Sequence, residues 1–163
     1  MDPSETIVGV MGPGGGATDK DKSTAYELGQ KIAQHSWTLL TGGRSEGVME
    51  ASMKGAVEAG GTTIGILPGT SPAGMSDYVQ IPIFTGMGHA RNVINIHSSR
   101  LTFACGLGAG TSSEISLALK TGTPVILLRQ SPDTITYYQQ LSTTLLHPAD
   151  DPDDAVAKAY RLL

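Results

Sequence analysis

The chain of 163 residues contains a single cysteine and no apolar run of the ~20 residues that a membrane-spanning helix needs. One cysteine cannot form an internal disulfide, which favours a reducing, cytoplasmic setting. Basic residues are also scarce, because 11 lysines and arginines stand against 15 acidic residues, for a net charge of −4. Nucleic-acid binders usually carry a basic stripe, so we expect no nucleic-acid partner. Since a long apolar run is also missing, we expect no membrane partner either. An anionic ligand would have to be held by local donors.

Glycine, by contrast, is abundant: the chain contains 21 glycines, well above the usual share of about 7%. They cluster at 12–16, 42–43, 60–61, 86–88 and 106–110, just beyond apolar runs. Because glycine has no Cβ, such loops let the backbone come close to a bound molecule. The pattern is typical of an α/β protein whose strand ends turn tightly toward a ligand.

Apolar runs and helical periodicities alternate along most of the chain, while residues 133–143 have no clear pattern. Pro82 demotes its apolar run to an edge or short strand. The alternation predicts right-handed crossovers and a mostly parallel sheet, hence one doubly wound, Rossmann-like α/β domain over residues 1–163. Its ligand should bind at the topological switch point, beyond the carboxyl ends of the strands. The predicted strands are 6–11, 37–41, 62–67, 78–84, 100–104, 123–128 and 144–147, and the predicted helices are 19–35, 46–59, 91–98, 115–120 and 152–162.

The most informative segment runs from Cys105 to Glu114, between a predicted buried strand and a predicted helix. Its glycines allow close backbone approach, and the hydroxyls and free N–H groups at the helix start can hold an anion, most often a phosphate. Glu114 is expected in the first turn of that helix. The candidate binding residues here are Gly108, Ala109, Gly110, Thr111, Ser112 and Glu114.

Two earlier loops also combine glycines with groups that could bind an anion. The first, 12–17, fits the dinucleotide fingerprint G-x-G-x-x-G/A, but the ribose-binding acid expected ~20 residues later is missing. Arg44 stands there and could meet a 2′-phosphate, so NADP remains one hypothesis. The loop could also simply shape the strand–helix corner, and a general phosphate or pterin-phosphate cradle fits better. The candidates are Gly12, Gly14, Gly15, Gly16, Thr41, Gly42, Gly43 and Arg44.

A third loop, 86–92, opens a helix with Arg91, an unfavourable place for a cation near the positive end of the helix dipole. We therefore expect a ligand or Glu114 to compensate its charge. Glu114 could instead be an acid that simply suits its own helix start, or the pair could act by general acid–base chemistry. The candidates in this loop are Gly88, His89, Arg91 and Asn92. Buried cysteine is usually inert, and the histidines show no metal-ligand spacing, so no metal site is predicted.

Two motifs together, Gly-His-Ala-Arg91-Asn and Gly-Leu-Gly-Ala-Gly-Thr-Ser-Ser-Glu114, resemble the lysine-decarboxylase-like superfamily. That group includes the Lonely Guy cytokinin-activating phosphoribohydrolases. Its pattern is an arginine opening one helix and Pro-Gly-Gly-x-Gly-Thr-x-x-Glu opening the next. The resemblance covers residues 6–128, but Gly106-Leu107 replaces the family's Pro-Gly, and Arg91-Asn92 replaces its Arg-Lys pair. Matching residues are Arg91, Gly108, Gly110, Thr111 and Glu114.

Longer stretches look closer to another branch, the molybdenum cofactor carrier proteins of algae and cyanobacteria. They are Gly-Pro-Gly-Gly-Gly, Thr-Gly-Gly-Arg, Gly-His-Ala-Arg-Asn-Val-Ile-Asn and Gly-Ala-Gly-Thr-Ser-Ser-Glu-Ile. This resemblance implies a non-catalytic protein that binds the molybdenum cofactor, protects it and delivers it to molybdoenzyme apoproteins. It also implies a homo-oligomer, dimer or tetramer. The rival hypotheses are a nucleoside 5′-monophosphate phosphoribohydrolase using Arg91 and Glu114, and a nucleotide-sensing binding module.

Overall fold

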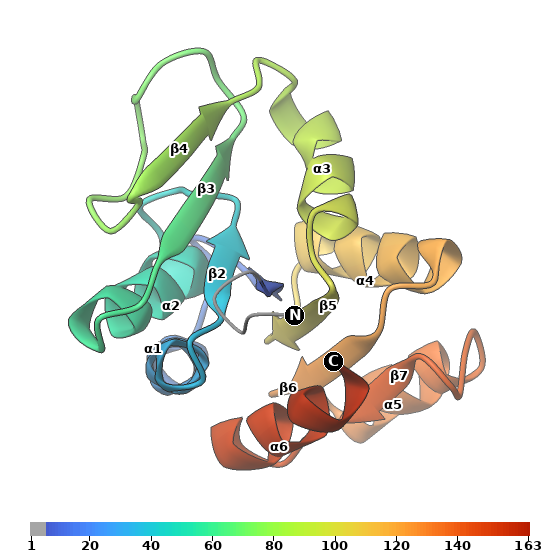
Figure 1. Cartoon of the computed structure of the whole chain (residues 1–163). Helices are drawn as coiled ribbons and strands as arrows, with labels where there is room; N and C mark the ends of the chain where they lie inside the picture. Colours follow the sequence, from blue (N-terminus) through green and yellow to red (C-terminus); the bar gives the residue numbers. More distant parts are fainter. Residues whose placement is uncertain (1–5) are drawn as a thin grey trace.

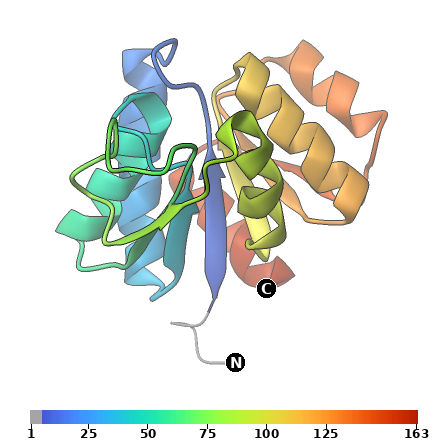
Figure 2. The ribbon, with the colours of Figure 1, turned by 90° about the horizontal axis from the view of Figure 1, so that it is seen from above.

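The computed structural model describes residues 6–163. Its seven strands form one sheet in the order β4-β3-β2-β1-β5-β6-β7, and every neighbouring pair is parallel. Helices cover both faces of the sheet (Figures 1 and 2). The predicted doubly wound α/β fold is therefore confirmed. The strands are β1 (Ile7–Met11), β2 (Thr38–Thr41), β3 (Thr63–Leu67), β4 (Ile81–Phe84), β5 (Leu101–Cys105), β6 (Val125–Leu128) and β7 (Leu146–Pro148). The helices are α1 (Asp19–Gln34), α2 (Gly47–Glu58), the 3-10 helix η2 (Gly88–Arg91), α3 (Asn92–His97), α4 (Ala109–Thr121), α5 (Pro132–Gln139) and α6 (Pro152–Leu162).

Two hydrophobic clusters hold the helices against the two faces. Helices α1, α2 and α6 contribute apolar residues to one cluster, and α3, α4 and α5 contribute to the other. The inner strand β5 is buried along its whole length, as a parallel strand covered on both faces must be. Each helix among the described residues is too short or too polar to cross a membrane.

The chain changes its direction of travel through the sheet between β4 and β5. Strands β1 to β4 are added one after another toward one edge, and β5 then returns to pair with the free side of β1. Helix α1 follows β1 on one face, whereas α4 follows β5 on the other. The loops after these two neighbouring strands therefore diverge, as expected at a topological switch point.

Helix α4 begins at Ala109, six residues before the predicted periodic segment. Gly108 caps it in an extended conformation, and the small polar residues that follow already have helical geometry. The apolar periodicity starts only at Ile115, where the helix first packs on the core. Glu114 therefore lies in the second turn and not in the first, as we had predicted.

The unassigned segment contains a further helix, α5. Ser131 accepts a hydrogen bond from the backbone N–H of Thr134, and Pro132 occupies the first helical position. A serine followed by proline is a standard start signal, but the helix buries only Tyr138, so its apolar periodicity is weak.

Strand β4 lies at one edge of the sheet, as Pro82 indicated. The backbone N–H of Thr85 donates to Leu67 O of β3, so by alternation Ile81 and Ile83 also turn their N–H groups toward β3. Pro82 faces outward, where it removes a donor from the open edge. An edge without that donor is a poor template for another strand.

Candidate ligand-binding site

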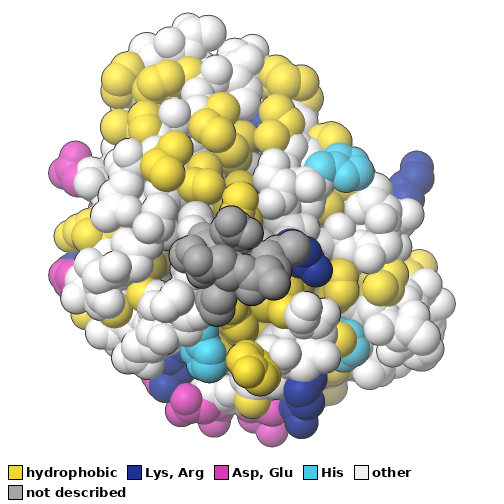
Figure 3. Space-filling view, in the orientation of Figure 1, with side chains coloured by type: hydrophobic (Ala, Val, Ile, Leu, Met, Phe, Trp, Pro, Cys, Tyr) yellow, Lys and Arg dark blue, Asp and Glu magenta, His cyan; other side chains and the backbone are white. Residues whose placement is uncertain are grey.

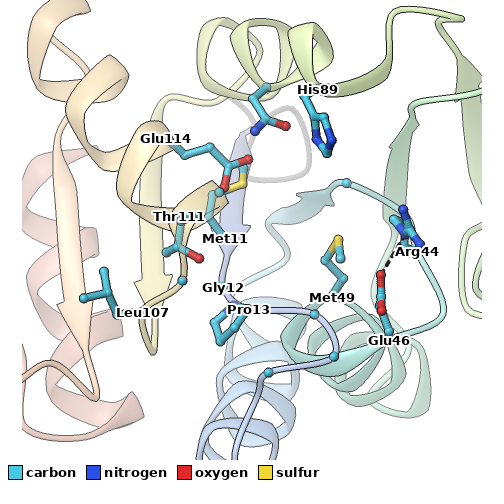
Figure 4. Close-up of a pocket in the computed structure, with 18 of the residues that line it drawn as sticks. Met11, Gly12, Pro13, Arg44, Glu46, Met49, His89, Leu107, Thr111 and Glu114 are labelled. Carbon is cyan, nitrogen blue, oxygen red and sulfur yellow. Dashed lines mark ion pairs between the residues drawn. The ribbon is translucent and has the colours of Figure 1, made fainter.

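A cavity of about 400 Å³ opens at the switch point, beyond the ends of β1 and β5 (Figure 4). Four stretches of the chain line it: residues 10–16, 42–49, 89–92 and 107–114. The structure thus brings the predicted loops together on one hollow. The predicted residues that line it are Gly12, Gly14, Gly15, Gly16, Gly42, Arg44, His89, Arg91, Asn92, Gly108, Ala109, Gly110, Thr111 and Glu114.

The other predicted binding residues, Thr41, Gly43, Gly88 and Ser112, lie outside this lining. Thr41 is buried, and its hydroxyl accepts from the backbone N–H of Gly43 at 3.4 Å. Gly43 has φ +74 and packs against β3. The hydroxyl of Ser112 is hydrogen-bonded to that of Tyr138 at 2.6 Å. These three residues shape the loops and do not face the cavity.

Sequence reasoning missed a second group of lining residues. Pro13 and Leu107 lie inside the glycine motifs, from which only the small and polar residues had been predicted to bind a ligand. Glu46 was predicted only as the start of a helix, and Met49 follows it by one helical turn on α2. The missed residues are Val10, Met11, Pro13, Glu46, Met49 and Leu107.

The start of α4 offers unused hydrogen-bond donors to the cavity. Its N-cap, Gly108, has no side chain to cap the first turn. Thr111 is only 2% exposed, and its hydroxyl has no partner among the described residues. A Cβ added to Gly110 would meet no atom within 4 Å. Free N–H groups, a buried hydroxyl and open space together suit an anion.

Arg91 faces the same cavity as a buried cation. It is 7% exposed, its Nη1 donates to Asn92 Oδ1 at 2.7 Å, and its Nε has no partner within residues 6–163. A Cβ on Gly42 would lie 2.8 Å from Arg91 Nη2, so that glycine makes room for the guanidinium. Burial lowers the pKa of Arg91, and Glu114 partly opposes this. A buried, incompletely paired cation favours an anionic ligand.

Glu114 lines the cavity from α4 (Figure 4). Pairing with Glu114 was one of the two ways in which we expected the charge of Arg91 to be compensated, and no ion pair of 4.0 Å or less joins them in the described chain. Glu114 Oε1 instead accepts from Asn95 Nδ2 at 3.2 Å. Burial raises the pKa of Glu114 to about 7, against the lowering effects of Asn95 and Arg91. Near neutral pH this carboxyl can therefore also be a donor.

The sequence pattern of the SLOG cluster4 family matches residues 5–156. The chain belongs to the SLOG cluster4 family. An uncharacterized protein of Archaeoglobus fulgidus is 45% identical over 125 residues, which are 75% of this chain and 79% of that protein.

Solved structures similar to this SLOG cluster4 chain include two that confirm the resemblance seen in the motifs. The molybdenum cofactor binding protein of the phototrophic bacterium Rippkaea orientalis is 47% identical, with a TM-score of 0.94 over 96% of each chain. The molybdenum cofactor carrier protein of Chlamydomonas reinhardtii is 49% identical, with a TM-score of 0.92 over 96% of this chain and 97% of that one. DNA processing protein A of Helicobacter pylori, at 20% identity and a TM-score of 0.71, shares the fold alone.

The single cysteine of this SLOG cluster4 chain is the last residue of β5 and does not line the cavity. Cys105 is 0% exposed, and its Sγ contacts Asp21 O at 3.5 Å. Burial raises the pKa of the thiol to about 12. Since the thiolate is the reactive form, this residue is a packing group. Among the described residues, no three His, Cys, Asp or Glu side chains gather as a metal site.

Proposed function

We propose that this chain is a molybdenum cofactor carrier that binds the cofactor, protects it and passes it to molybdoenzyme apoproteins without chemistry of its own. The observation that carries the proposal is the shared cavity at the switch point, with its free helix start and its buried arginine. The similarity to a cofactor binding protein and a carrier protein over 96% of the chain supports the same cargo.

The chemistry of the cargo fits these residues. The cofactor has a phosphate monoester, a planar pterin with hydrogen-bonding edges, and an oxyanionic molybdenum centre. The α4 start, Thr111 and Arg91 would hold an anionic part. Most of these donors are neutral, which permits a moderate affinity and hence release. The reducing cytoplasmic compartment and the apoenzyme acceptors belong to this proposal.

The direct test is cofactor protection and transfer. Isolated molybdenum cofactor is incubated in air with the purified protein or with the same mass of serum albumin, and samples are then used to reconstitute an apo-molybdoenzyme. We expect the protein to prolong the period over which activity is restored. Equal decay in the two samples would reject the carrier function.

A second candidate is phosphoribohydrolase activity, because Arg91 and a protonatable Glu114 face one cavity. In that case AMP or a cytokinin ribotide should yield free base, and Glu114→Ala should abolish the release. A thermal-shift screen of nucleotides and pterins also covers the sensing hypothesis, because a ligand at 100 times its Kd adds about 2.7 kcal/mol of stability. A shift by nucleotides without turnover would favour a sensor.

Gly110→Val should block the cavity without harming the fold. The added side chain enters open space, and valine is no worse than glycine in a helix, so stability should change by less than about 0.5 kcal/mol. Cofactor affinity should fall by about 10-fold, or roughly 1.4 kcal/mol. The control is Cys105→Ala, which removes a wholly buried core atom and should lower stability but leave affinity unchanged. Equal affinities in Gly110→Val and wild type would contradict this placement of the cargo.

The homo-oligomer expected from the resemblance is part of the same proposal, and one sheet face supports it. On the sheet face that carries Ile64, the neighbouring strand β4 adds Ile81 and Ile83. These two side chains lie beyond the part of the face that α3 covers, and they are 46% and 44% exposed. Figure 3 shows hydrophobic side chains gathered over the region of β3, β4 and α3. A second copy has the same apolar face, so the two can cover each other around a two-fold axis.

Ile83→Lys should therefore shift the protein toward the monomer in size-exclusion chromatography with light scattering. A lysine would have to be desolvated in such an interface, which is unfavourable without a partner charge. Leu141→Lys adds the same charge at another exposed apolar position and should leave the assembly intact. The assignment of this face is wrong if both variants behave alike.

A further inference from the structure

The cavity has a second acidic side chain, Glu46, which does not cap the helix that it precedes. Glu46 is the N-cap residue of α2, yet it makes no capping hydrogen bond. A donor in the first turn of α2 already has another acceptor, since the N–H of Val48 donates to Pro13 O at 3.0 Å. Gly47, with φ +58, packs directly on the carbonyl oxygens of Pro13 and Gly14. The Glu46 side chain is thus released from the helix start and turned toward the cavity.

Contacts fix this carboxylate over the glycine loop. Arg44 Nε pairs with Glu46 Oε1 at 2.8 Å. A Cβ on Gly14 would lie 2.9 Å from Glu46 Cδ, so glycine is what permits the side chain to lie there. The second oxygen, Oε2, has no hydrogen bond within residues 6–163, and the side chain is 37% exposed. Arg44 therefore orients the Glu46 carboxylate, and its Oε2 can still accept a hydrogen bond from a molecule in the cavity.

The two acids belong to opposite walls of the cavity. Figure 4 shows Glu114 and Thr111 on the α4 side and Glu46, with Arg44, on the α2 side. The α4 side has free donors and therefore takes the anionic part of a ligand. A carboxylate accepts hydrogen bonds only, so the α2 side takes a part of the ligand that presents N–H groups. A pterin does so, since its ring N3–H and its 2-amino group are parallel donors that match the two oxygens of one carboxylate.

We propose that Glu46 selects the pterin: its carboxylate accepts the N3–H and 2-amino hydrogens of a 2-amino-4-oxo heterocycle, and Arg44 positions it. This inference rests on the proposed carrier function and deepens it. Because adenine lacks this pair of donors, the residue would favour pterins over adenine nucleotides. Lumazines, in which an oxygen replaces the 2-amino group, would place an acceptor against an acceptor.

The experiment compares pterin-6-carboxylate with lumazine-6-carboxylate, which share the ring system and the anionic group. Binding is measured by ligand fluorescence for wild type, Glu46→Gln and Glu58→Gln. Wild type should prefer the pterin by roughly 10- to 100-fold, the size expected for hydrogen bonds to a charged group. Glu46→Gln should lose most of that preference, and Glu58→Gln should keep it. Glu58 is an exposed acid on the same helix, so the control carries the same charge change.

Each outcome bears on Glu46 separately from the carrier function. An unchanged preference in Glu46→Gln, an equal loss of affinity for both ligands, or the absence of a preference in wild type would overturn the inference. Arg44→Met provides a second variant, in which the freed carboxylate should show a smaller loss of preference. Failure of wild type to protect the molybdenum cofactor would reject the carrier function. Protection by wild type and by Glu46→Gln alike would reject only the role of Glu46.

Discussion

At about pH 8 the Glu114→Gln variant should be more stable than wild type, whereas at about pH 4 the two should unfold with similar free energies. The pKa of Glu114 rises in the folded protein from 4.5 to about 7 because the carboxyl is buried. Below 4.5 the group is neutral in both states. Between pH 4.5 and about 7 the carboxyl ionises in the unfolded chain but keeps its proton in the folded one, so wild type progressively loses about 3 kcal/mol of stability, and the loss is complete just above pH 7. Glutamine remains neutral and can still accept the hydrogen bond from Asn95. Urea unfolding across this pH range measures the difference.

Glu114 should also couple binding of the cofactor to the uptake of a proton. An anion held at the α4 start lies beside Glu114 and disfavours its charged form. Wild type should therefore take up a proton on binding, and its affinity should fall by up to roughly tenfold per pH unit above 7. The cargo's phosphate ionises in a similar range, but it does so equally for both proteins. Parallel affinity curves for wild type and Glu114→Gln would show that Glu114 does not face the bound anion.

Gly12→Ala should destabilise the protein by about 3 kcal/mol, as overpacking of a well-packed region can. An added Cβ would lie 2.5 Å from both Cys105 O and Val48 Cγ1. The carbonyl belongs to the end of β5 and the valine to the first turn of α2, so neither can move cheaply. The first glycine loop would be pushed away from the strand end, and cofactor binding should weaken with it. Thermal and urea unfolding report the first effect.

Gly16→Ala is the matched control on the same loop. A Cβ there meets no atom within 4 Å. Its stability should equal that of wild type or exceed it slightly, because alanine restricts the unfolded chain. If both alanines cost the same, the contact of Gly12 with β5 and α2 would not be what requires glycine at position 12.

The sequence predicted the fold because its signals are local. Buried strands such as 101–105 are continuous apolar runs, and the glycines mark the ends of β1, β2 and β5. The switch-point rule then places those ends around one cavity, and most of the predicted residues do line it. Thr41, Gly43 and Ser112 were included because motif membership does not tell which way a side chain turns.

What could not be predicted depends on contacts between distant segments. Glu114 accepts a hydrogen bond from Asn95 and forms no ion pair with Arg91, because α3 and α4 pack together. The spacing of these residues along the chain does not reveal that packing. Glu46 enters the cavity because Pro13 O satisfies the α2 start. Helix α5 was missed because it buries a single side chain and shows little periodicity.

The buried thiol has a practical consequence for handling the protein in air. Cys105, with its pKa near 12 and no exposed surface, offers oxidants and electrophiles no point of attack on the folded chain. Exposure to air should therefore form neither a sulfenic acid nor a disulfide-linked dimer through Cys105. Purified protein should accordingly run as a single non-cross-linked band on a non-reducing gel without any added reductant.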